Sequence, residues 1–436
     1  MNLIIIGLIL LAVFGEPLFI VIGGAAFACF YFLLNVSPST LFTDFYRLST
    51  MPILIAIPLF IFSGSMLAEG RVPQKMLRFA NALLGWAPSG LVLVALVACS
   101  VFTAFTGASA ITIVAVGALV YPALIKSGYS EKFTLGLVTV SGSLGTLLIP
   151  CLPLIIYGVI ASQQSPLNVE DMFVAGIIPN ILLVILLWIY AFFAAPKSQA
   201  PQKFSWSELG SATWSIKWEL PLPIIVVGGI LSGLITAAEA AAVTVIYILI
   251  IEMFINKDLN LTKLIQIIRR SMIMNGAVKI ILGMALGLTD VFVNLSLPDK
   301  LFTLISANVH DKHTFLLLLN IFILFVGCSM DIFSACLVVV PIIVPIAVKY
   351  HIHPVHLGII FLTNMELGFL APPMGISLFI SSLKFNKSLP TILKSVIPFF
   401  LVMLIGLLLI TYVPQLSLYL LRFKSQGTLI DPASLF

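Results

Sequence analysis

Residues 139–150 read Thr-Val-Ser-Gly-Ser-Leu-Gly-Thr-Leu-Leu-Ile-Pro, and residues 363–373 read Thr-Asn-Met-Glu-Leu-Gly-Phe-Leu-Ala-Pro-Pro. Gly145 of the first stretch lies 223 positions before Gly368 of the second. A single register that holds from residue 16 to residue 150 indicates an internal repeat. The same offset relates six further pairs: Leu144 with Leu367, Leu147 with Leu370, Pro150 with Pro373, Pro122 with Pro345, Lys126 with Lys349, and Glu16 with Glu239.

The composition is that of an integral membrane protein. The chain of 436 residues is 61% hydrophobic and 9% charged. Its mean hydropathy of +1.18 lies far outside the range of soluble proteins. Long runs of Leu, Ile and Val without alternation favour helices over a barrel, so we expect an all-α polytopic membrane protein. In such a chain an internal repeat indicates a secondary transporter with a site between its two halves.

Two apolar segments, 90–125 and 313–348, are each long enough for two short helices. Each carries a polar cluster in its middle, Thr106–Ser109 in the first and Cys328–Asp331 in the second. Because a polar break at membrane depth must face protein or a water-filled cavity, we expect both segments to be re-entrant hairpins. Membrane spans are predicted over residues 3–14, 17–35, 52–68, 133–160, 171–195, 219–235, 237–255, 272–295, 356–383 and 391–413.

The basic residues indicate which way the chain threads the membrane. With ten passes and two hairpins, fifteen basic residues fall on one face and six on the other, with Lys279 inside a span. The positive-inside rule makes the face with fifteen cytoplasmic, so the hairpins open from opposite sides and the two repeats are inverted. The fifteen are Arg71, Lys75, Arg78, Lys126, Lys132, Lys197, Lys203, Lys217, Lys257, Lys263, Arg269, Arg270, Lys384, Lys387 and Lys394, and the six are Arg47, Lys300, Lys312, Lys349, Arg422 and Lys424.

This threading predicts how the chain is divided. The first inverted repeat covers residues 1–195, with a hairpin at 90–125 and a broken helix at 133–160. The second repeat covers 219–415, with a hairpin at 313–348 and a broken helix at 356–383. A connector at 196–218 joins the two repeats, and a short tail covers 416–436. Three tryptophans among polar residues in Phe204–Trp218 predict a helix in the plane of the membrane interface. Such a helix is either a strut that holds a scaffold in place or an ordinary connector in the aromatic belt.

The two broken helices and the two hairpin turns contain the candidate site. Glycine permits unwound backbone, and proline frees a carbonyl four residues earlier. Freed carbonyls coordinate sodium, and half-helix N-termini favour an anionic substrate. We expect the first sodium site at Thr106, Ser109, Ser141 and Gly145, the second at Ser329, Asp331, Thr363 and Gly368, and substrate contacts from Thr106, Gly107, Ser109, Ser143, Pro150, Asn364 and Pro373. The alternative for each hydroxyl is a hydrogen bond to the preceding helical turn.

Ionisable residues inside a membrane are costly and suggest function. Asp331 either caps a half-helix or faces a cation, and Glu366 lies in the second broken helix. Glu16 and Glu239 occupy equivalent helix starts, where capping is favoured over ion binding. Lys279 either snorkels to the interface or opposes a carboxylate.

With these features in place, the chain resembles the large membrane subunit of the TRAP (tripartite ATP-independent periplasmic) transporters. The resemblance covers nearly the whole length. It rests on six stretches: Ala56–Gly64, Phe105–Thr112, Pro122–Tyr129, Gly228–Ala242, Met330-Asp331 with Pro341 and Pro345, and Asn364–Gly368 with Pro372, Pro373 and Gly375. The chain departs from the family at Ile149–Pro153, where the family more often carries Pro-Pro-Ser.

The resemblance implies sodium-coupled uptake of an organic anion, a carboxylate or a compound such as sialic acid, by an elevator mechanism in the bacterial inner membrane. It also implies two partners, a small four-helix membrane subunit and a periplasmic substrate-binding protein. Since no four-helix extension is fused to this chain, we expect the small subunit to be a separate chain.

Other classes of function fit the sequence less well. A stand-alone sodium-coupled carrier of dicarboxylates or citrate fits the physical pattern nearly as well, and only the family motifs argue against it. An intramembrane enzyme is not expected, because the sequence has no H-E-x-x-H pair. It also has no phosphate-binding G-x-x-x-x-G-K-[ST] loop, so ATP is not expected to be the direct energy source. His351, His353 and His356 lack an evident fourth metal ligand. The modest net charge of +5 gives no sign of nucleic-acid binding.

Overall fold

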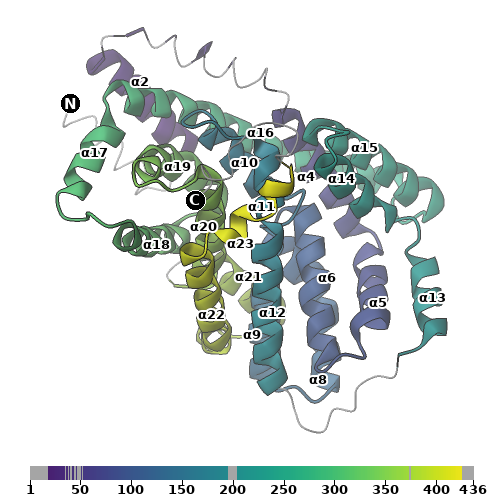
Figure 1. Cartoon of the computed structure of the whole chain (residues 1–436). Helices are drawn as coiled ribbons and strands as arrows, with labels where there is room; N and C mark the ends of the chain where they lie inside the picture. Colours follow the sequence, from purple (N-terminus) through teal and green to yellow (C-terminus); the bar gives the residue numbers. More distant parts are fainter. Residues whose placement is uncertain are drawn as a thin grey trace.

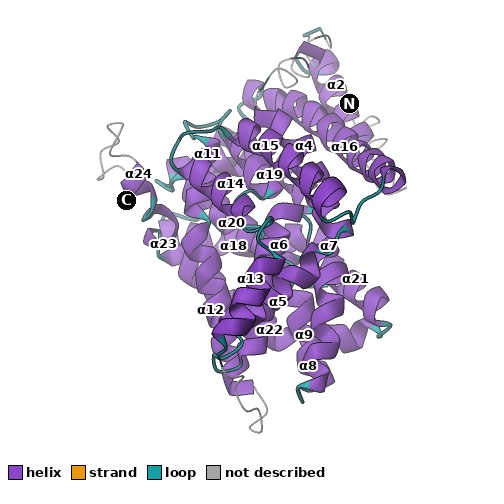
Figure 2. Cartoon of the chain, turned by 90° about the vertical axis from the view of Figure 1, so that its right-hand side faces the viewer, coloured by secondary structure: helices purple, strands orange, loops and turns teal. Residues whose placement is uncertain are grey.

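The structure is a computed structural model that describes residues 18–34, 36, 37, 39, 42, 43, 46, 51, 53–194, 204–372 and 375–424. Within these residues every regular element is a helix, as the composition predicts (Figure 2). By length and apolar composition, seven of the described helices can cross a membrane, or up to eight if the bent pair over residues 54–84 counts as one span. The predicted span 3–14 lies outside the described residues.

The first half begins with α2 (Leu18–Phe32) and α4 (Ile53–Glu69), close to two predicted spans. A further helix, α5 (Val72–Leu84), follows and is bent from α4 by 76°. No predicted span covers α5. Pro73 lies in its first turn, where proline is favoured because the backbone N–H there has no partner within the helix.

The first predicted hairpin is present as two helical arms joined by a tight turn. Helix α6 (Gly90–Thr106) ends at Gly107, whose φ of 66° places it in the left-handed region that favours glycine. The hydroxyls of Thr103 and Thr112, one from each arm, hydrogen bond at 2.7 Å, so the chain reverses between them. The return arm consists of α7 (Ser109–Thr112), η1 (Ile113–Gly117) and α8 (Ala118–Lys126). Its re-entrant course through a bilayer stays a prediction.

Both broken helices lie where the sequence predicts them. In the first, α9 (Glu131–Ser141) and α10 (Leu152–Ala161) flank non-helical turns. In the second, α20 (Pro354–Gly368) and α21 (Ile376–Phe385) flank the Gly- and Pro-containing break. We call these two non-helical segments the first break and the second break.

The remaining helices complete the described chain. They are α11 (Val169–Ala175), α12 (Ile177–Ala194), α13 (Trp206–Ser215), α14 (Pro221–Leu231), α15 (Ala237–Ile250), η2 (Ile251–Ile255), α16 (Leu261–Asn294), α17 (Leu297–Ser306), α18 (Lys312–Ser329), α19 (Ile332–Lys349), α22 (Leu389–Tyr412), α23 (Gln415–Leu418) and α24 (Leu421–Lys424). Helices α18 and α19 correspond to the second predicted hairpin. Helix α16 starts well before the predicted residue 272, because Asn260 caps it by accepting a hydrogen bond from the Lys263 amide at 2.9 Å.

The helix bounds repeat at the offset found in the sequence. Moved by 223 residues, the return arm over residues 109–126 coincides with α19 over 332–349. Helix α6 falls within one residue of α18, and α10 within one residue of α21. The internal register therefore extends to the order of the helices, while the boundaries of the two repeats stay predictions.

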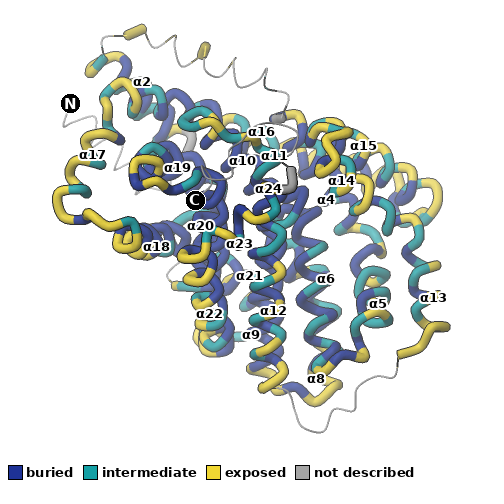
Figure 3. Tube along the Cα trace, in the orientation of Figure 1, coloured by how far each residue is buried: buried dark blue, intermediate teal, exposed yellow. Residues whose placement is uncertain are grey.

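The core of the protein surrounds α10 and α20. Every residue of both helices is buried, and both run through the middle of the molecule (Figures 1 and 3). Helix α10 packs against α19, α20 and α4, and α20 packs against α18 and α22. Helices α10 and α20, each of which adjoins a break, are thus enclosed by protein, as irregular backbone in a membrane requires.

A second group of helices packs together on one side of this core. Helix α4 contacts α15 and α16, α2 contacts α16, and α14 contacts α15. In Figure 1 these helices gather at the top, while α6, α9, α12 and α22 extend downward. We call α2, α4, α14, α15 and α16 the frame helices.

Candidate functional site

The two broken helices lie side by side and run in opposite directions. Thr139 of α9 donates to Ser381 of α21 at 2.8 Å, and Tyr157 of α10 donates to the carbonyl of Pro354 at the start of α20, at 2.9 Å. Between these contacts, Thr146 of the first break donates to Glu366 of α20. Residue numbers rise along one broken helix as they fall along the other. This antiparallel pairing is what an inverted repeat requires.

The first break packs directly on the first hairpin. A Cβ built on Gly145 would lie 2.1 Å from the Ser100 carbonyl oxygen and 2.7 Å from the Ala104 nitrogen. Thr103 donates to the Gly142 carbonyl oxygen at 2.9 Å, in addition to its bond with Thr112. Only glycine at position 145 allows the break and α6 to approach this closely.

The second break makes the equivalent contact with the second hairpin. A Cβ built on Gly368 would lie 2.5 Å from the Cα of Gly327 on α18. The repeat offset carries Gly145 onto Gly368 and Ala104 onto Gly327. Each half of the chain therefore presses its broken helix against the first arm of its own hairpin at the same position.

The residues predicted for the first sodium site gather around this contact. A Cβ on Gly142, next to Ser141, would lie 3.2 Å from the Ser109 carbonyl oxygen, so the hairpin turn and the break are neighbours. The hydroxyl of Thr106 donates to the Phe102 carbonyl at 3.0 Å, and that of Ser141 donates to Val138 at 3.2 Å. Both hydroxyls bond the preceding turn here, and their role as sodium ligands stays a prediction.

The residues predicted for the second sodium site lie in the matching place. Gly368 packs against Gly327, which lies two residues before Ser329. The Ser329 hydroxyl donates to the Phe325 carbonyl at 2.9 Å. The Thr363 hydroxyl is buried and donates to Ile359 at 2.7 Å. The Asp331 carboxylate accepts hydrogen bonds from the amides of Phe333 and Ser334, both at 3.0 Å, and so caps α19. These contacts show Asp331 as a helix cap, and its role as a sodium ligand stays a prediction.

The predicted substrate contacts are divided between the hairpin and the breaks. Thr106, Gly107 and Ser109 form the first hairpin turn. Ser143 and Pro150 are buried in the first break, with the Ser143 hydroxyl on the Val140 carbonyl at 3.0 Å. Pro373 lies outside the described residues.

Asn364 is hydrogen bonded to a residue of α18. Its amide nitrogen donates to Asn320 Oδ1 at 2.6 Å and to the Ile360 carbonyl at 2.9 Å. Asn320 in turn donates to Thr411 of α22 at 3.1 Å, so Asn364 belongs to a buried polar cluster between α18, α20 and α22. Asn364 Oδ1 has no hydrogen-bond partner among the described residues, and the contact of Asn364 with substrate stays a prediction.

The other ionisable residues have clear places in the fold. Glu239 and Thr236 form a capping box at the start of α15, which confirms the capping interpretation. Lys279 is half-buried on α16, and no ion pair joins it to another described residue. Glu16 lies outside the described residues. His356 is buried and hydrogen bonds to Ser417 at 3.2 Å and to the Thr411 carbonyl at 3.3 Å.

The connector contains a helix, α13, which packs on α5. Arg78 of α5 lies 2.9 Å from Glu208 and 3.0 Å from the Ser211 hydroxyl. Trp206 and Trp214 of α13 stay 78% and 71% exposed, as a helix that meets lipid headgroups requires. Its position in the interface plane stays a prediction.

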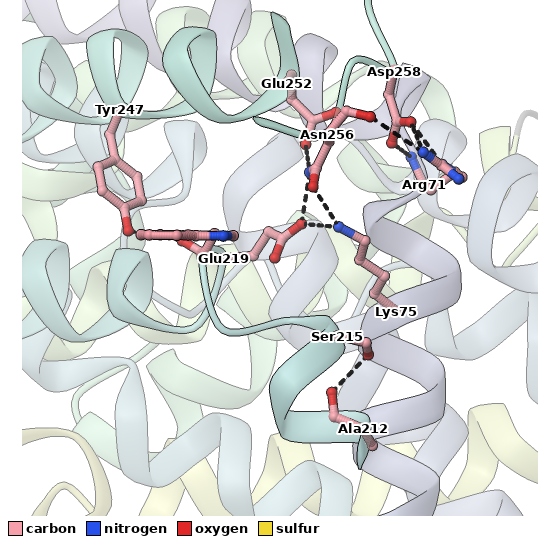
Figure 4. Close-up of polar contacts among 10 residues, drawn as sticks. Arg71, Lys75, Ala212, Ser215, Glu219, Tyr247, Glu252, Asn256 and Asp258 are labelled. Carbon is pink, nitrogen blue, oxygen red and sulfur yellow. Dashed lines mark hydrogen bonds and ion pairs between the residues drawn. The ribbon is translucent and has the colours of Figure 1, made fainter. Parts of the chain in front are cut away.

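A charged network fixes α5 to the frame helices (Figure 4). Lys75 Nζ lies 2.6 Å from Glu219 Oε1, ahead of α14, and 2.9 Å from Asn256 Oδ1, after η2. Asn256 Nδ2 donates to both Glu219 and Glu252 at 3.0 Å. Lys75 is separated from Glu219 and from Asn256 by more than 140 residues in sequence, so no local pattern predicts these contacts.

A second ion pair strengthens the same junction. The Arg71 Nε lies 2.6 Å from Asp258 Oδ1, and its amide donates to Asp258 Oδ2 at 3.1 Å. Burial tends to raise the pKa of Asp258, but the hydrogen bonds and charge of Arg71 outweigh it and lower the pKa below its usual value. Asp258 is therefore ionised and holds the α4–α5 bend.

Comparison with known proteins places this arrangement in a family. The sequence model described as "Tripartite ATP-independent periplasmic transporter, DctM component" matches residues 5–416. The C4-dicarboxylate TRAP transporter large permease protein DctM of Rhodobacter capsulatus is 33% identical over 436 residues, covering 96% of this chain and 98% of its own. The protein of the same name from Pseudomonas aeruginosa is 31% identical over 369 residues, covering 84% of this chain and 86% of its own.

One solved structure shows how far the fold extends beyond close relatives. The Alcanivorax borkumensis YdaH transporter, described as having an unusual topology, aligns with a TM-score of 0.62 over 86% of this chain and 87% of its own. At 14% sequence identity this likeness concerns the fold alone. The family assignment rests on the sequence matches, whose members are named as transporter permeases and not as enzymes. The chain belongs to the DctM family of tripartite ATP-independent periplasmic transporters.

Proposed function

We propose that this chain takes up an organic anion together with sodium ions across the bacterial inner membrane. The observation that carries the proposal is the repeated contact between a broken helix and a hairpin, at Gly145 with Ala104 and at Gly368 with Gly327. Each contact brings unwound backbone beside a helix end. Carbonyls freed in this way coordinate small cations, and helix N-termini attract an anionic group.

The substrate class follows from the same geometry and from the relatives. Helices α10 and α21 each begin at a break, so their partially positive N-termini are available to an anion. The two relatives described above are named for C4-dicarboxylates. A carboxylate is therefore the substrate class we propose, with C4-dicarboxylates as the first candidates and sialic acid as a second.

An elevator movement suits the packing. The hairpins and broken helices form the proposed mobile unit, and the frame helices, with α5 and α13 fixed to them, form the proposed stationary unit. The network of Lys75, Glu219 and Asn256 supports this division, because it fastens α5 to the ends of α14 and η2. Such a movement exposes a site at mid-membrane to alternate sides.

Two partners complete the proposed transporter. The tripartite architecture of the family supports a small membrane subunit and a periplasmic substrate-binding protein. In this scheme the binding protein delivers the anion and the small subunit strengthens the frame helices.

The test is uptake into proteoliposomes that contain this chain and the small subunit. Labelled C4-dicarboxylates and sialic acid are supplied with an inward sodium gradient, with and without the cognate binding protein. Uptake that needs both sodium and the binding protein is the expected result. Sodium-driven uptake without the binding protein would instead identify a stand-alone carrier, and uptake that ignores the sodium gradient would contradict the coupling.

A further inference from the structure

An apolar cavity of about 250 Å³ lies between α5, α6 and the segment that leads into α14. Helix α5 lies between α6 and α13 and packs on both (Figure 1). Leu83 in the cavity wall is 40% exposed and several other wall residues are half-buried, so the cavity opens to the outside of the chain. The walls include Met76, Ala80 and Leu84 of α5 and Val97, Ala98 and Val101 of α6.

The cavity offers almost no polar group to an occupant. Glu219 is the one ionisable residue among the described residues that line it, and its Oε1 already accepts hydrogen bonds from Lys75 and Asn256. The other wall side chains are aliphatic or aromatic. An apolar cavity of about 150 Å³ in a protein stays dry and takes up benzene. This larger cavity therefore favours a larger apolar occupant.

A phospholipid acyl chain is the occupant whose chemistry fits. An extended polypeptide in the cavity would leave its backbone N–H and C=O groups without partners, because the walls provide none. An acyl chain has no such groups. It also enters from a bilayer that is as apolar as the cavity, so no water has to be removed from it. Once inside, it gives the wall side chains the dispersion contacts that an empty space denies them.

A positive charge without a carboxylate partner lies next to the cavity. Lys217 directly follows Ile216, one of the wall residues. Its Nζ lies 3.5 Å from the centre of the Trp214 ring and 5.3 Å from that of the Trp218 ring, and no ion pair joins it to another described residue. Both tryptophans are exposed. Exposed tryptophan and lysine are typical of the headgroup level of a membrane, where lysine attracts lipid phosphate.

Two other positive charges beside the cavity are already paired. Arg78 of α5 precedes the wall residue Phe79 and lies 2.9 Å from Glu208 of α13. Lys75 lies 2.6 Å from Glu219. Lys217 is therefore the charge that is left for an anionic headgroup.

We propose that this cavity is a phospholipid site, in which one acyl chain lies between α5 and α6 and the phosphate group lies at Lys217. The acyl chain fills the space that the small side chains of Ala80 and Ala98 leave open. The charged contact of the phosphate with Lys217 distinguishes a phospholipid from other apolar molecules.

The site lies at the joint between the two proposed units of the transporter. Helix α6 is the first arm of the first hairpin and so belongs to the mobile unit, whereas α5 and α14 belong to the stationary unit. Because both units supply walls, a bound acyl chain favours the arrangement described here over one in which α6 has moved away. This consequence rests on the proposed function, while lipid binding itself does not.

The test is photochemical cross-linking in lipid nanodiscs that contain the purified chain, with and without the small subunit. The probe is phosphatidylglycerol with a photoactivatable group near the end of one acyl chain, and mass spectrometry of the digested protein locates the attachment. We expect cross-links within residues 76–84 and 97–101 that are lost in Val97→Phe, whose larger side chain fills the cavity. Val114→Phe is the matched control, because Val114 is 43% exposed on the return arm of the same hairpin and should leave the cross-links unchanged.

A second pair of variants tests the headgroup contact. Lys217→Gln should lower the cross-linking yield several-fold, whereas Lys263→Gln, which replaces an exposed lysine in the first turn of α16, should not. This pair keeps the test open if Val97→Phe does not fold.

Three results would overturn the proposal. Cross-links that are equal in Val97→Phe and Val114→Phe would mean that the probe reports only bulk lipid at the surface. An unchanged yield in Lys217→Gln would remove the phosphate contact. Cross-links that disappear when the small subunit is added would assign the cavity to that partner. Sodium-driven uptake is a separate measurement, so a chain that cross-links the lipid but shows no sodium-driven uptake would contradict the proposed function alone.

Discussion

Gly368 and Gly327 lie so close that a Cβ added to Gly368 would come within 2.5 Å of the Gly327 Cα. The pair joins the end of α20 to the end of α18, beside the second break. Its counterpart in the first half joins Gly145 to the backbone of α6. Because the same close approach occurs at two related positions, we place these two contacts at the centre of the proposed transport site.

Gly368→Ala should impair transport and destabilise the protein. The added methyl group meets backbone atoms that cannot move aside, and overpacking of this kind costs about 1–3 kcal/mol. The measurement is thermal unfolding in detergent together with sodium-driven uptake. Gly276→Ala is the matched control, since a Cβ on Gly276 of α16 meets nothing within 4 Å. Equal behaviour of the two variants would contradict the packing argument.

Gly145→Ala should change sodium dependence in particular. The methyl group would displace the first break from Ser100 and Thr103, and with it the carbonyls around Ser141 that we expect to hold sodium. We expect half-maximal uptake to require more sodium, even at saturating substrate. Gly228→Ala serves as control because its surroundings are open. An unchanged sodium dependence in a folded Gly145→Ala protein would remove the first break from the sodium site.

Asp331 permits a test that separates capping from ion binding. Asparagine caps a helix about as well as aspartate, whereas alanine loses about 0.5–2 kcal/mol. If the carboxylate only caps α19, Asp331→Asn should keep both stability and sodium-driven uptake, and Asp331→Ala should lose stability. If Asp331 also binds sodium, Asp331→Asn should fold normally but need more sodium. The capping contacts in the structure favour the first outcome.

The network beside α5 should matter more for stability than the exposed ion pairs do. Lys75 and Glu219 side chains are 19% and 6% exposed, so Lys75→Met leaves a buried carboxylate without its partner, at a cost of about 3–5 kcal/mol. The exposed pair of Arg270 and Glu69 is the control, because Arg270→Met should cost no more than about 1 kcal/mol. Thermal unfolding of both variants checks the difference. A melting temperature for Lys75→Met no lower than that of the control would contradict the role of this network in fixing α5 to the frame helices.

Much of the fold could be predicted because the membrane limits the choices. Gly142, Gly145 and Pro150 interrupt a long apolar run, and so do Gly368 and Pro372, so the two broken helices were visible in the sequence. The turn at Gly107 was visible for the same reason. Shorter helices were missed: α5 and α17 carry polar residues along one face and fall below the length and hydropathy of a span.

The contacts that define the site could be predicted only in part. Positions such as Gly145 were found because glycine has a backbone role that does not depend on its partners. The partners themselves were not found: Thr146 bonds Glu366 across 220 residues, and Asn364 bonds Asn320 across 44. Which face of a helix meets which neighbour is decided by packing of the whole chain, and one sequence does not contain that information in local form.

The most direct test of the account is whether sodium enters with the substrate. Proteoliposomes with this chain, the small subunit and the loaded binding protein are given radioactive sodium outside, and its entry is followed with and without a labelled C4-dicarboxylate. We predict sodium entry that depends on the dicarboxylate and is lost in Gly368→Ala but kept in Gly276→Ala. Entry of the dicarboxylate with no accompanying sodium, or equal sodium entry in the two glycine variants, would contradict the claim that the paired breaks and hairpins form a sodium-coupled transport site.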